Sequence, residues 1–417
     1  MEYRSRTIDD LVDQHLQAMG GVLLEGPRGC GKTATGEHHS RSSIRLDSSP
    51  QLVQLAQLNP QALLEGDTPR LIDEWQIAPI LWNAARHEID TRGQPGQFIF
   101  SGSASPPPDP SRHSGAGRVS RLRMHTMSLA ERGLSTGQVS LEDLHQGLSE
   151  VSSRSNLSYE QLSKCTIHGG WPGLLASSET AAIRFNRSYC EDISSAGIAA
   201  PAGAMHDPIR MRRLLSSIAR NISSEATMRS LANDVGGSDT SIHPETIRTY
   251  LDSLTRIFCL DELPAWGAKL RSRSRLRTAS KLHFCDPALA TAALGVTSDR
   301  LAHDPEFFGQ VFESLVIHDL RVYAQAHDAQ VFHYRDSTGL EVDAIVEYSW
   351  GDWAGIEVKL GWNQIETAER NLLKLRDSRV DTDIAGKPSF LAIITGTEYG
   401  YTLPSGVHVI PLGVLRA

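Results

Sequence analysis

The stretch LLEGPRGCGKTATGE, residues 23–37, decides the fold expected for the N-terminal part of this sequence. From Gly26 to Thr33 it fits the pattern G-x-x-x-x-G-K-[ST], with a short apolar run before it and a helix-compatible segment after it. Glycines let the backbone turn so that successive N–H groups point at phosphate oxygens, and the following helix adds the positive end of its dipole. The pattern therefore predicts a strand, a phosphate-binding loop and a helix within an α/β fold.

The side chains of this loop indicate which ligand it takes. Lys32 can reach the β and γ phosphates of a nucleoside triphosphate, and the hydroxyl of Thr33 can bind Mg²⁺. ATP and Mg²⁺ are therefore the expected cofactors. The residues expected to bind the nucleotide are Gly26, Pro27, Arg28, Gly29, Cys30, Gly31, Lys32, Thr33 and Ala34.

Two more short apolar runs, RLIDE and QFIFSGS, follow with helix-like segments between them. Short buried strands that alternate with helices indicate a parallel sheet. The first run ends in Asp73, which can hold the magnesium ion, and in Glu74, which can orient and deprotonate an attacking water. The second ends in Ser101 and Ser103. We expect Ser101 to act near the γ phosphate, although serines that close a strand are often turn formers.

A second group of charged residues lies near the C-terminus, in EVDAIVE and GIEVKL. Asp343, Glu357 and Lys359 fit the D…E-x-K pattern of the PD-(D/E)XK nuclease fold. Residues two apart on a strand point to the same face, so a carboxylate and an amine come to lie beside Asp343. Such a group assembles Mg²⁺ ligands and a lysine that polarises water or phosphate. Glu313 matches the glutamate that an upstream helix supplies in this fold, and Gln364 is a candidate supporting residue.

At 417 residues, the chain is long enough for two or three domains. We predict a P-loop parallel-sheet ATPase core at residues 1–140, a helical and winged-helix region at 141–300, and an α/β restriction-nuclease-like domain at 301–417. The winged helix is expected at residues 228–263, where the pattern indicates helix, turn, helix and strand.

The net charge of −8 argues against a protein covered in basic surface, so any nucleic-acid site is expected to be confined. The stretch KLRSRSRLRTASK, residues 269–281, carries no acidic residue and is the candidate for such a patch. Basic side chains there can contact phosphates without discriminating between sequences, and a solvated loop is the alternative. The segment at 104–117, rich in Pro, Ser and Gly, is expected to be a mobile loop.

The five cysteines form no C-x-x-C pair and no spacing typical of a zinc site, which favours reduced thiols in the cytoplasm. The N-terminus is charged and amphipathic, unlike a signal sequence, and no run approaches the ~18 apolar residues of a membrane helix. We therefore expect a soluble, cytoplasmic protein without a membrane partner.

The motifs GVLLEGPRGCGKT, LIDEWQ, FIFSGS, GRVSRLRMHTMSLAE, GGWPGLL and KLHFCDPALA occur in this order along the chain. In these motifs and their order, the sequence resembles a group of predicted bacterial and archaeal AAA+ ATPases, whose C-terminal domain of unknown function looks like a PD-(D/E)XK nuclease fold. The resemblance spans nearly the whole chain and implies ATP binding. It also implies that Arg118, or else Arg121 or Arg123, senses the γ phosphate or serves as an arginine finger.

Both groups of residues lead to one hypothesis: an AAA+-type ATPase hydrolyses ATP to control a C-terminal nuclease-like domain that interacts with DNA or RNA. One alternative is a nucleotide-dependent switch whose C-terminal domain binds a protein or DNA partner without cleavage. A nucleotide kinase is a second alternative, although the Asp73–Glu74 pair suits water activation better than transfer to an acceptor. A homo-oligomer or a protein partner is compatible with each of these.

Overall fold

The computed structural model describes residues 3–104, 114–148, 150–195, 206–237, 242–268 and 278–417. The chain divides into two compact units. The first consists of Met1–Thr126, Trp171–Gly173 and Leu254–Cys259, and the second of Met127–Gly170, Leu174–Ser253 and Leu260–Ala417. Most of the expected loop at 104–117 and of the basic stretch at 269–281 lies outside the described residues, so both predictions stay open there.

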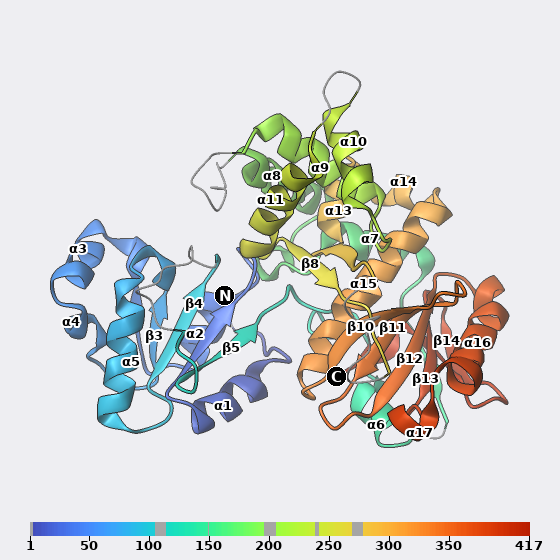
Figure 1. The fold of residues 1–417 in the computed structure, drawn as a ribbon, viewed down its shortest axis with the longest axis horizontal. Helices are drawn as coiled ribbons and strands as arrows, with labels where there is room; N and C mark the ends of the chain where they lie inside the picture. The colour runs from blue at the N-terminus through green and yellow to red at the C-terminus, as the bar shows by residue number, and fades with distance from the viewer. Residues whose placement is uncertain (1–2, 105–113, 149, 196–205, 238–241, 269–277) are drawn as a thin grey trace. The chain divides into compact units, whose positions relative to one another are not determined.

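A five-stranded parallel sheet forms the centre of the first unit, in the order β2–β3–β4–β1–β5 (Figure 1). The strands are β1 Gly21–Glu25, β2 Ser42–Arg45, β3 Arg70–Asp73, β4 Phe98–Gly102 and β5 Val119–Arg123. Because every pairing is parallel, the carboxyl ends of all five strands meet at one edge, where ligands bind in open α/β sheets. The predicted P-loop parallel-sheet core is confirmed.

Helices cover both faces of this sheet: α1 Asp9–Ala18, α2 Lys32–His38, α3 Pro50–Leu58, α4 Pro60–Leu64 and α5 Ile80–Arg92. Alternate residues of β1 enter two different cores. Leu23 packs with Leu81 of α5 in one core, whereas Val22 and Leu24 pack with Val12 of α1 in the other. Burial on both faces explains why these strands are apolar throughout.

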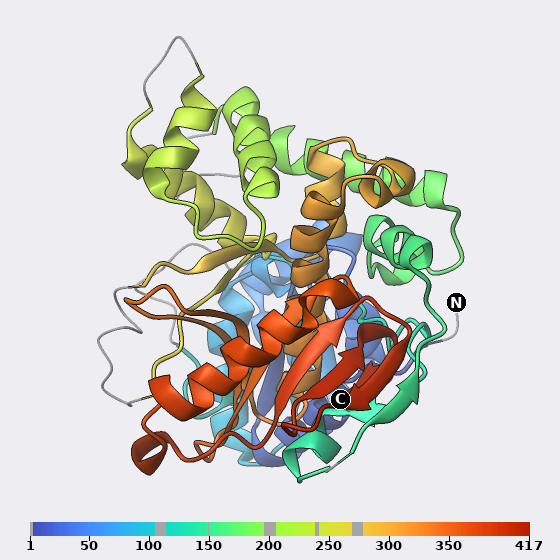
Figure 2. The ribbon, with the colours of Figure 1, turned by 90° about the vertical axis from the view of Figure 1, so that its right-hand side faces the viewer.

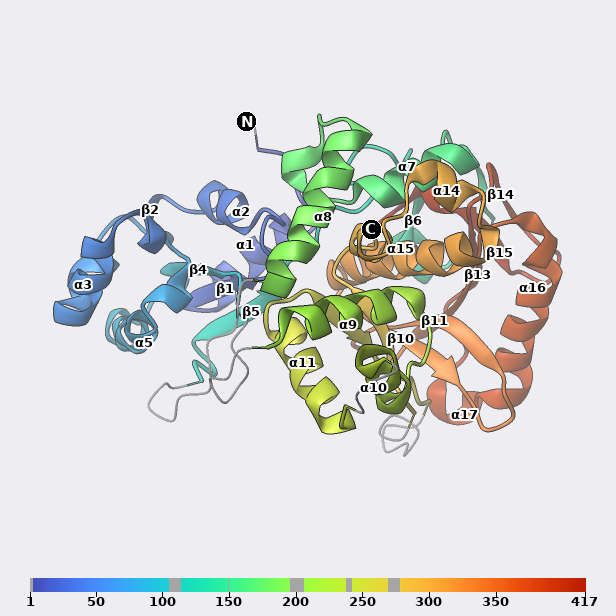
Figure 3. The same cartoon turned by 90° about the horizontal axis from the view of Figure 1, so that it is seen from above.

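The second unit begins with short elements and helices: β6 Val139–Ser140, α6 Leu141–His145, α7 Tyr159–His168, α8 Glu179–Ser195, α9 Pro208–Arg220, α10 Met228–Gly236 and α11 Pro244–Arg256. Helix α10 packs on α9 (Figure 3), and β8 Leu260–Leu263 pairs antiparallel with β9 Lys281–Phe284. The order of helices and strands agrees with the pattern expected at 228–263. A winged helix remains a prediction.

A seven-stranded sheet follows, in the order β10–β11–β12–β13–β15–β14–β7. Its strands are β7 Ser152–Arg154, β10 Gln330–Arg335, β11 Glu341–Glu347, β12 Trp353–Lys359, β13 Leu391–Thr395, β14 Tyr399–Thr402 and β15 His408–Pro411. Strand β7 comes from the part of the chain that we expected to be helical, and β6 pairs with β16 Leu415–Arg416 near the C-terminus. Residues 139–140 and 152–154 therefore pair with strands near the C-terminus, β6 in a separate two-stranded sheet and β7 in the seven-stranded one, which the predicted boundaries missed.

Helix α16, Ile365–Lys374, covers one face of this sheet (Figure 2), and α15, Pro305–Gln325, lies along the other (Figure 3). Further helices of the unit are α13 Ala288–Ala293, α14 Ser298–Ala302 and α17 Thr382–Ala385. None of the helices in the described ranges combines the length and the apolar character that a membrane span requires.

Candidate functional site

The glycine-rich loop between β1 and α2 needs its glycines for two reasons. Gly29 and Gly31 have φ values of 78° and 107°, in the left-handed region that favours glycine. A Cβ atom added to Gly26 would lie 2.3 Å from the backbone oxygen of Met124. The loop can therefore follow its tight path close to the neighbouring backbone only with these residues.

The nucleotide pocket, of about 570 Å³, opens beside this loop. Its lining residues are Arg28, Gly29, Gly31, Lys32, Thr33, Ala34, Asp47, Glu74, Gln76, Ile77 and Ser103. They come from the segments that follow β1, β2, β3 and β4, at the carboxyl edge of the sheet. Among the other loop residues predicted to bind nucleotide, Cys30 turns its side chain into the buried core shared with α1.

Lys32 is held against the loop by its own side chain. Its ammonium group donates hydrogen bonds to the backbone oxygens of Gly26, at 2.9 Å, and Pro27, at 2.8 Å, and the residue is buried. The carbonyl groups keep the charge at the mouth of the loop, where phosphate oxygens can replace them as acceptors.

Asp73 meets the P-loop threonine at the carboxyl edge. The hydroxyl of Thr33 lies 3.1 Å from both carboxylate oxygens of Asp73, and Ser101 donates a hydrogen bond to the same carboxylate. Burial raises the pKa of Asp73, while the bonds from Ser101 and Thr33 lower it. A hydroxyl and a carboxylate oxygen brought together in this way are the hard ligands that Mg²⁺ prefers, so this pair fits a magnesium site.

Glu74 lines the pocket in an unusual backbone conformation, with φ at 54°. Gln76 donates a hydrogen bond to the Glu74 carboxylate, and the hydroxyl of Ser103 donates another at 3.1 Å. The buried amide oxygen of Gln76 has no hydrogen-bond partner among the described residues. Three polar groups therefore face the side of the pocket where an attacking water would be held.

Ser101 of β4 and Ser103, which follows this strand, have different surroundings. Ser101 is fully buried behind Asp73 and does not line the pocket, whereas Ser103 lines it and contacts Glu74. The prediction that Ser101 contacts the γ phosphate is therefore wrong. Ser101 instead donates a hydrogen bond that supports Asp73. The sequence feature that could have indicated Ser103 is its position two residues after Ser101, directly after the end of β4.

The arginine predicted to sense the γ phosphate lies at the wrong edge of the sheet for its own P-loop. Arg118 precedes β5, and its backbone oxygen accepts a hydrogen bond from Gly21, the first residue of β1, whereas the P-loop follows the last. Its guanidinium group pairs with Asp90 of α5 at 2.8 Å. Because β5 runs parallel to β1, Arg118 lies at the amino edge of the sheet. The prediction that Arg118 senses the γ phosphate bound to its own chain is therefore wrong. An arginine finger toward another copy stays a prediction.

The other two arginines lie further along β5. Arg121 pairs with Glu25 at 2.8 Å, and its guanidinium lies 5.7 Å from the centre of the Trp82 ring. Arg123, at the carboxyl end of the strand, stacks on the Phe258 ring at 4.3 Å. Neither lines the nucleotide pocket.

The residues of the D…E-x-K pattern come together on β11 and β12, which pair antiparallel. The ammonium of Lys359 lies 3.1 Å from Asp343 Oδ2 and 2.6 Å from Glu357 Oε2. The backbone N–H of Val358 also donates to Asp343 Oδ2, at 2.8 Å. Asp343 and Glu357 are buried, at 8% and 2% exposure. Strand alternation thus assembles the predicted group.

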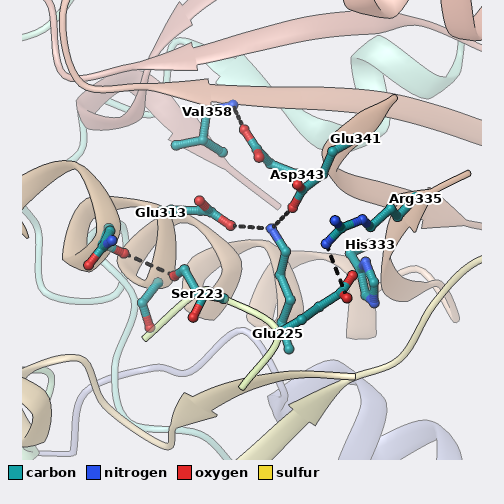
Figure 4. A network of polar contacts seen from close by, with 12 residues as sticks. Ser223, Glu225, Glu313, His333, Arg335, Glu341, Asp343 and Val358 are labelled. Atoms are coloured by element: carbon teal, nitrogen blue, oxygen red, sulfur yellow. Dashed lines mark hydrogen bonds and ion pairs between the residues drawn. The ribbon is translucent and has the colours of Figure 1, made fainter. Parts of the chain in front are cut away.

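Helix α15 adds Glu313 to the same place, and two further charged residues join it that the sequence analysis did not assign there. Figure 4 shows Glu313 and Glu341 turned toward the same nitrogen atom, with Asp343 beside them and directed at Val358. The ammonium of Lys281, from β9, lies 3.0 Å from Glu313 Oε1 and 2.7 Å from Glu341 Oε1. Glu341 stands two residues before Asp343 on β11, so strand alternation was an available signal for it.

These residues line a hollow of about 400 Å³, which we call the carboxylate pocket. Its lining residues are Ile222, Ser223, Ser224, Glu225, Lys281, Gln310, Glu313, Arg335, Glu341, Asp343, Glu357, Lys359 and Asn371. Asn371 of α16 donates a hydrogen bond to Glu357 Oε1 at 3.1 Å. Asn371 therefore takes the supporting place proposed for Gln364, which is exposed and does not line the pocket.

Burial and mutual repulsion shift the pKa values of this group. Burial raises the pKa of Glu313 and of Glu357, and the negative charge of Asp343 raises each further. Burial alone would also raise the pKa of Asp343, but the ammonium groups of Lys359 and Lys281 lower it below its ordinary value. Repulsion between adjacent carboxyl groups thus favours protons or a cation here. Three carboxylates and a lysine are the residue types of a divalent metal site, although the ligand oxygens of the three do not all lie within 4.8 Å of one another in this structure.

One part of the proposed basic patch is corrected. Lys281, the last residue of the stretch at 269–281, has 2% exposure and is enclosed by carboxylates, so it offers no charge to a phosphate on the surface. The sequence around it gives no local sign of this pairing, because both partners lie more than thirty residues away along the chain.

Family models match three stretches of the chain. Residues 20–132 match an AAA domain. The lining residues of the nucleotide pocket all lie within this stretch. Residues 159–300 and 308–415 match two domains of unknown function, DUF8612 and DUF4143. The first of these contains Lys281, and the second contains Glu313, Asp343, Glu357 and Lys359.

Uncharacterized proteins of Mycobacterium bovis and Mycobacterium tuberculosis are 25% identical to this chain over 405 residues, which cover 94% of it and 79% of each relative. Among solved structures, the chain is similar to the Walker-type ATPase of Pyrococcus abyssi, with 12% identity and a TM-score of 0.43 over 70% of this chain and 99% of that one. It is also similar to AMPPCP-bound DnaA from Aquifex aeolicus, with 14% identity and a TM-score of 0.23 over 59% and 86%.

Proposed function

We propose that the first unit binds ATP with Mg²⁺ and hydrolyses it. The observation that carries this proposal is the contact of Thr33 with Asp73 beside a glycine loop, with Glu74 on the wall of the same pocket. Thr33 and Asp73 would hold the magnesium ion, which neutralises charge on the phosphates. The match of residues 20–132 to an AAA domain supports the choice of nucleotide.

The chain's own groups then have distinct tasks. Backbone N–H groups of the loop and the ammonium of Lys32 bind the phosphates, and Lys32 gives up its carbonyl acceptors when it does so. Glu74 takes a proton from a water molecule, whose oxygen attacks the γ phosphorus while the bond to the ADP oxygen breaks. Ser103 and Gln76 hold the Glu74 carboxylate in place for this step.

Release of inorganic phosphate in the absence of any acceptor tests this proposal and separates it from a kinase. We expect wild-type protein with ATP and Mg²⁺ to release phosphate, and Glu74→Gln to bind ATP while releasing it far more slowly. Formation of ADP that requires an added acceptor, without release of inorganic phosphate, would favour the kinase.

For the C-terminal part we propose a metal-dependent site that cleaves phosphodiester bonds of DNA or RNA under the control of ATP. The supporting observation is the convergence of Glu313, Asp343, Glu357 and Lys359, from three elements, on one pocket. The three carboxylates would hold the divalent ion, which lowers the pKa of water and polarises the phosphate. Lys359 is placed to stabilise negative charge on the phosphate.

The matched pair Asp343→Ala and Lys359→Ala separates metal binding from chemistry. Titration with Mn²⁺ in the absence of nucleotide is expected to show binding that Asp343→Ala abolishes and Lys359→Ala retains, with cleavage lost in both. Weak binding that is identical in wild type and Asp343→Ala would instead favour the alternative function, a nucleotide-dependent switch that binds a partner without cutting.

A further inference from the structure

Lys281 occupies a place in the carboxylate pocket that the proposed metal chemistry does not explain. Its ammonium group lies between Glu313 and Glu341, within 3.0 Å and 2.7 Å of one oxygen of each. Its side chain is 3% exposed, so both contacts are shielded from water and from dissolved ions. Such shielding strengthens the Coulomb attraction within a pair, and the desolvation of its charges opposes that gain.

The two lysines of the pocket form ion pairs with different carboxylates. Lys359 contacts Asp343 and Glu357, whereas Lys281 contacts Glu313 and Glu341. Of the three proposed metal ligands, Glu313 is thus the one whose negative charge is paired with a lysine from outside the D…E-x-K group. A divalent ion that binds Glu313 must compete with a positive charge that already lies on it.

Glu341 gives Lys281 a second partner that is not a proposed metal ligand. At 39% exposure, the Glu341 side chain is the more accessible of the two, whereas that of Glu313 is 17% exposed. If Lys281 releases Glu313, its ammonium still has a carboxylate to bind. Release therefore avoids leaving a buried charge unpaired, which would be costly.

The strand that carries Lys281 belongs to a hairpin joined to the C-terminal sheet. Lys281 begins β9, and the segment after β8 runs along the edge strand β10: Trp266 N donates to His333 O at 2.7 Å, and His333 N donates to Pro264 O at 3.0 Å. His333 Nε2 also lies 3.0 Å from Ala279 O, two residues before Lys281. The position of Lys281 is thus fixed by the hairpin that follows α11.

We propose that Lys281 is a resident cation of the carboxylate pocket, which a divalent ion displaces from Glu313 and which then pairs with Glu341 alone. This inference rests on the proposed metal site. It adds that metal affinity depends on the place at which the β8–β9 hairpin holds Lys281, because an ammonium at this place competes with the ion for Glu313. The hairpin would thereby connect the helical part of the second unit to the chemistry of its C-terminal sheet.

Calorimetric titration of the full chain with Mn²⁺, without nucleotide, tests the proposal. Lys281→Met is expected to bind Mn²⁺ about tenfold more tightly than wild type, or tighter still, because it removes a competing charge from the site. Lys281→Arg keeps that charge and is expected to bind like wild type. Lys387→Met, at an exposed lysine of the same unit, is the matched control and is expected to leave affinity unchanged.

The outcomes separate this inference from the metal site itself. Binding by Lys281→Met that is equal to or weaker than wild type, yet still abolished by Asp343→Ala, would overturn the role of Lys281 and leave the metal site standing. Binding that Asp343→Ala does not change, in wild type and in Lys281→Met, would overturn both. If Lys281→Met does not unfold cooperatively, Lys281→Gln replaces it, because its amide is uncharged but can still donate hydrogen bonds to the carboxylates. Tighter Mn²⁺ binding than in wild type is then the expected result, and equal or weaker binding would overturn the proposal.

Discussion

In the nucleotide pocket, a buried aspartate is bonded to hydroxyl groups, and the lysine lies on backbone carbonyls. In the carboxylate pocket, four of the five carboxyl groups pair with two lysines, and the fifth, that of Glu225, pairs with Arg335. Asp73 makes hydrogen bonds with Thr33 and Ser101 and no ion pair with a lysine. Asp343 instead pairs with Lys359. Similar residue types are thus arranged by two different kinds of interaction.

This difference determines which kind of ligand each pocket can bind. A loop of N–H groups with one mobile ammonium suits an anion that brings its own metal ion, because little protein charge has to be displaced. A pocket whose acids are already paired with lysines admits a cation only in exchange for those pairs. Nucleotide binding should therefore tolerate changes in the second pocket, and metal binding there should respond strongly to single charges.

The largest expected effect is that of Lys32→Ala on ATP turnover. Loss of the cation that meets the phosphates is expected to lower turnover by roughly 10²- to 10³-fold. Lys359→Ala removes a lysine from the other pocket and is expected to leave phosphate release unchanged. A similar loss in both variants, measured by phosphate release, would show that the two pockets are not chemically separate.

Glu74→Gln is expected to slow turnover by about 10²-fold while ATP still binds, because the amide cannot take up the proton of the attacking water. Binding of a fluorescent ATP analogue and phosphate release measure the two effects. Glu65→Gln, at an exposed glutamate of the same unit, is the control and should behave as wild type. Wild-type turnover in Glu74→Gln would remove that residue from catalysis.

Asp343→Ala is expected to abolish detectable Mn²⁺ binding, because it removes the acid that the N–H of Val358 and the ammonium of Lys359 both contact. ATP turnover is expected to be unaffected. Calorimetry and phosphate release on the same preparation check both statements. Retained Mn²⁺ affinity would make the pocket a structural ion network.

The smallest expected effect is a pH dependence in the first unit. Burial would lower the pKa of His39, but hydrogen bonds to Asp9 and Asp13 raise it above its ordinary value. Because the folded pKa is the higher one, the stabilisation is complete below about pH 6.5 and is lost as pH rises through the folded value. Asp13→Asn is expected to reduce the resulting fall in melting temperature by about 1 to 3 °C.

The control for this pH effect is Asp10→Asn, at an exposed position of the same helix. It changes the net charge equally but leaves the contacts of His39 in place. The same pH dependence in wild type and Asp13→Asn, measured by thermal unfolding between pH 6 and 8, would show that the His39 pairs contribute nothing.

Features set by local pattern could be predicted from the sequence. The P-loop and its flanking strand and helix follow from eight consecutive residues, and the approach of Glu357 to Lys359 follows from strand alternation. The parallel sheet followed from apolar runs separated by helices. In each case neighbours along the chain determine the outcome.

Features set by distant neighbours could not be predicted. Strand β7 pairs with β14, about 250 residues later, and nothing in the sequence SSR specifies that partner. Lys281 was assigned to a basic surface because its acidic partners, on α15 and β11, lie far from it along the chain. Arg118 was assigned by motif, whereas strand direction places it at the amino edge of the sheet.

The most direct test of the account is cleavage of end-labelled DNA and RNA by wild type and Asp343→Ala, with Mg²⁺ or Mn²⁺ and with or without ATP. The account predicts cleavage of at least one substrate by wild type, a change in its rate on addition of ATP, and no cleavage by Asp343→Ala. Cleavage that persists in Asp343→Ala, or its absence in wild type under every condition, would contradict a metal-dependent nuclease controlled by ATP.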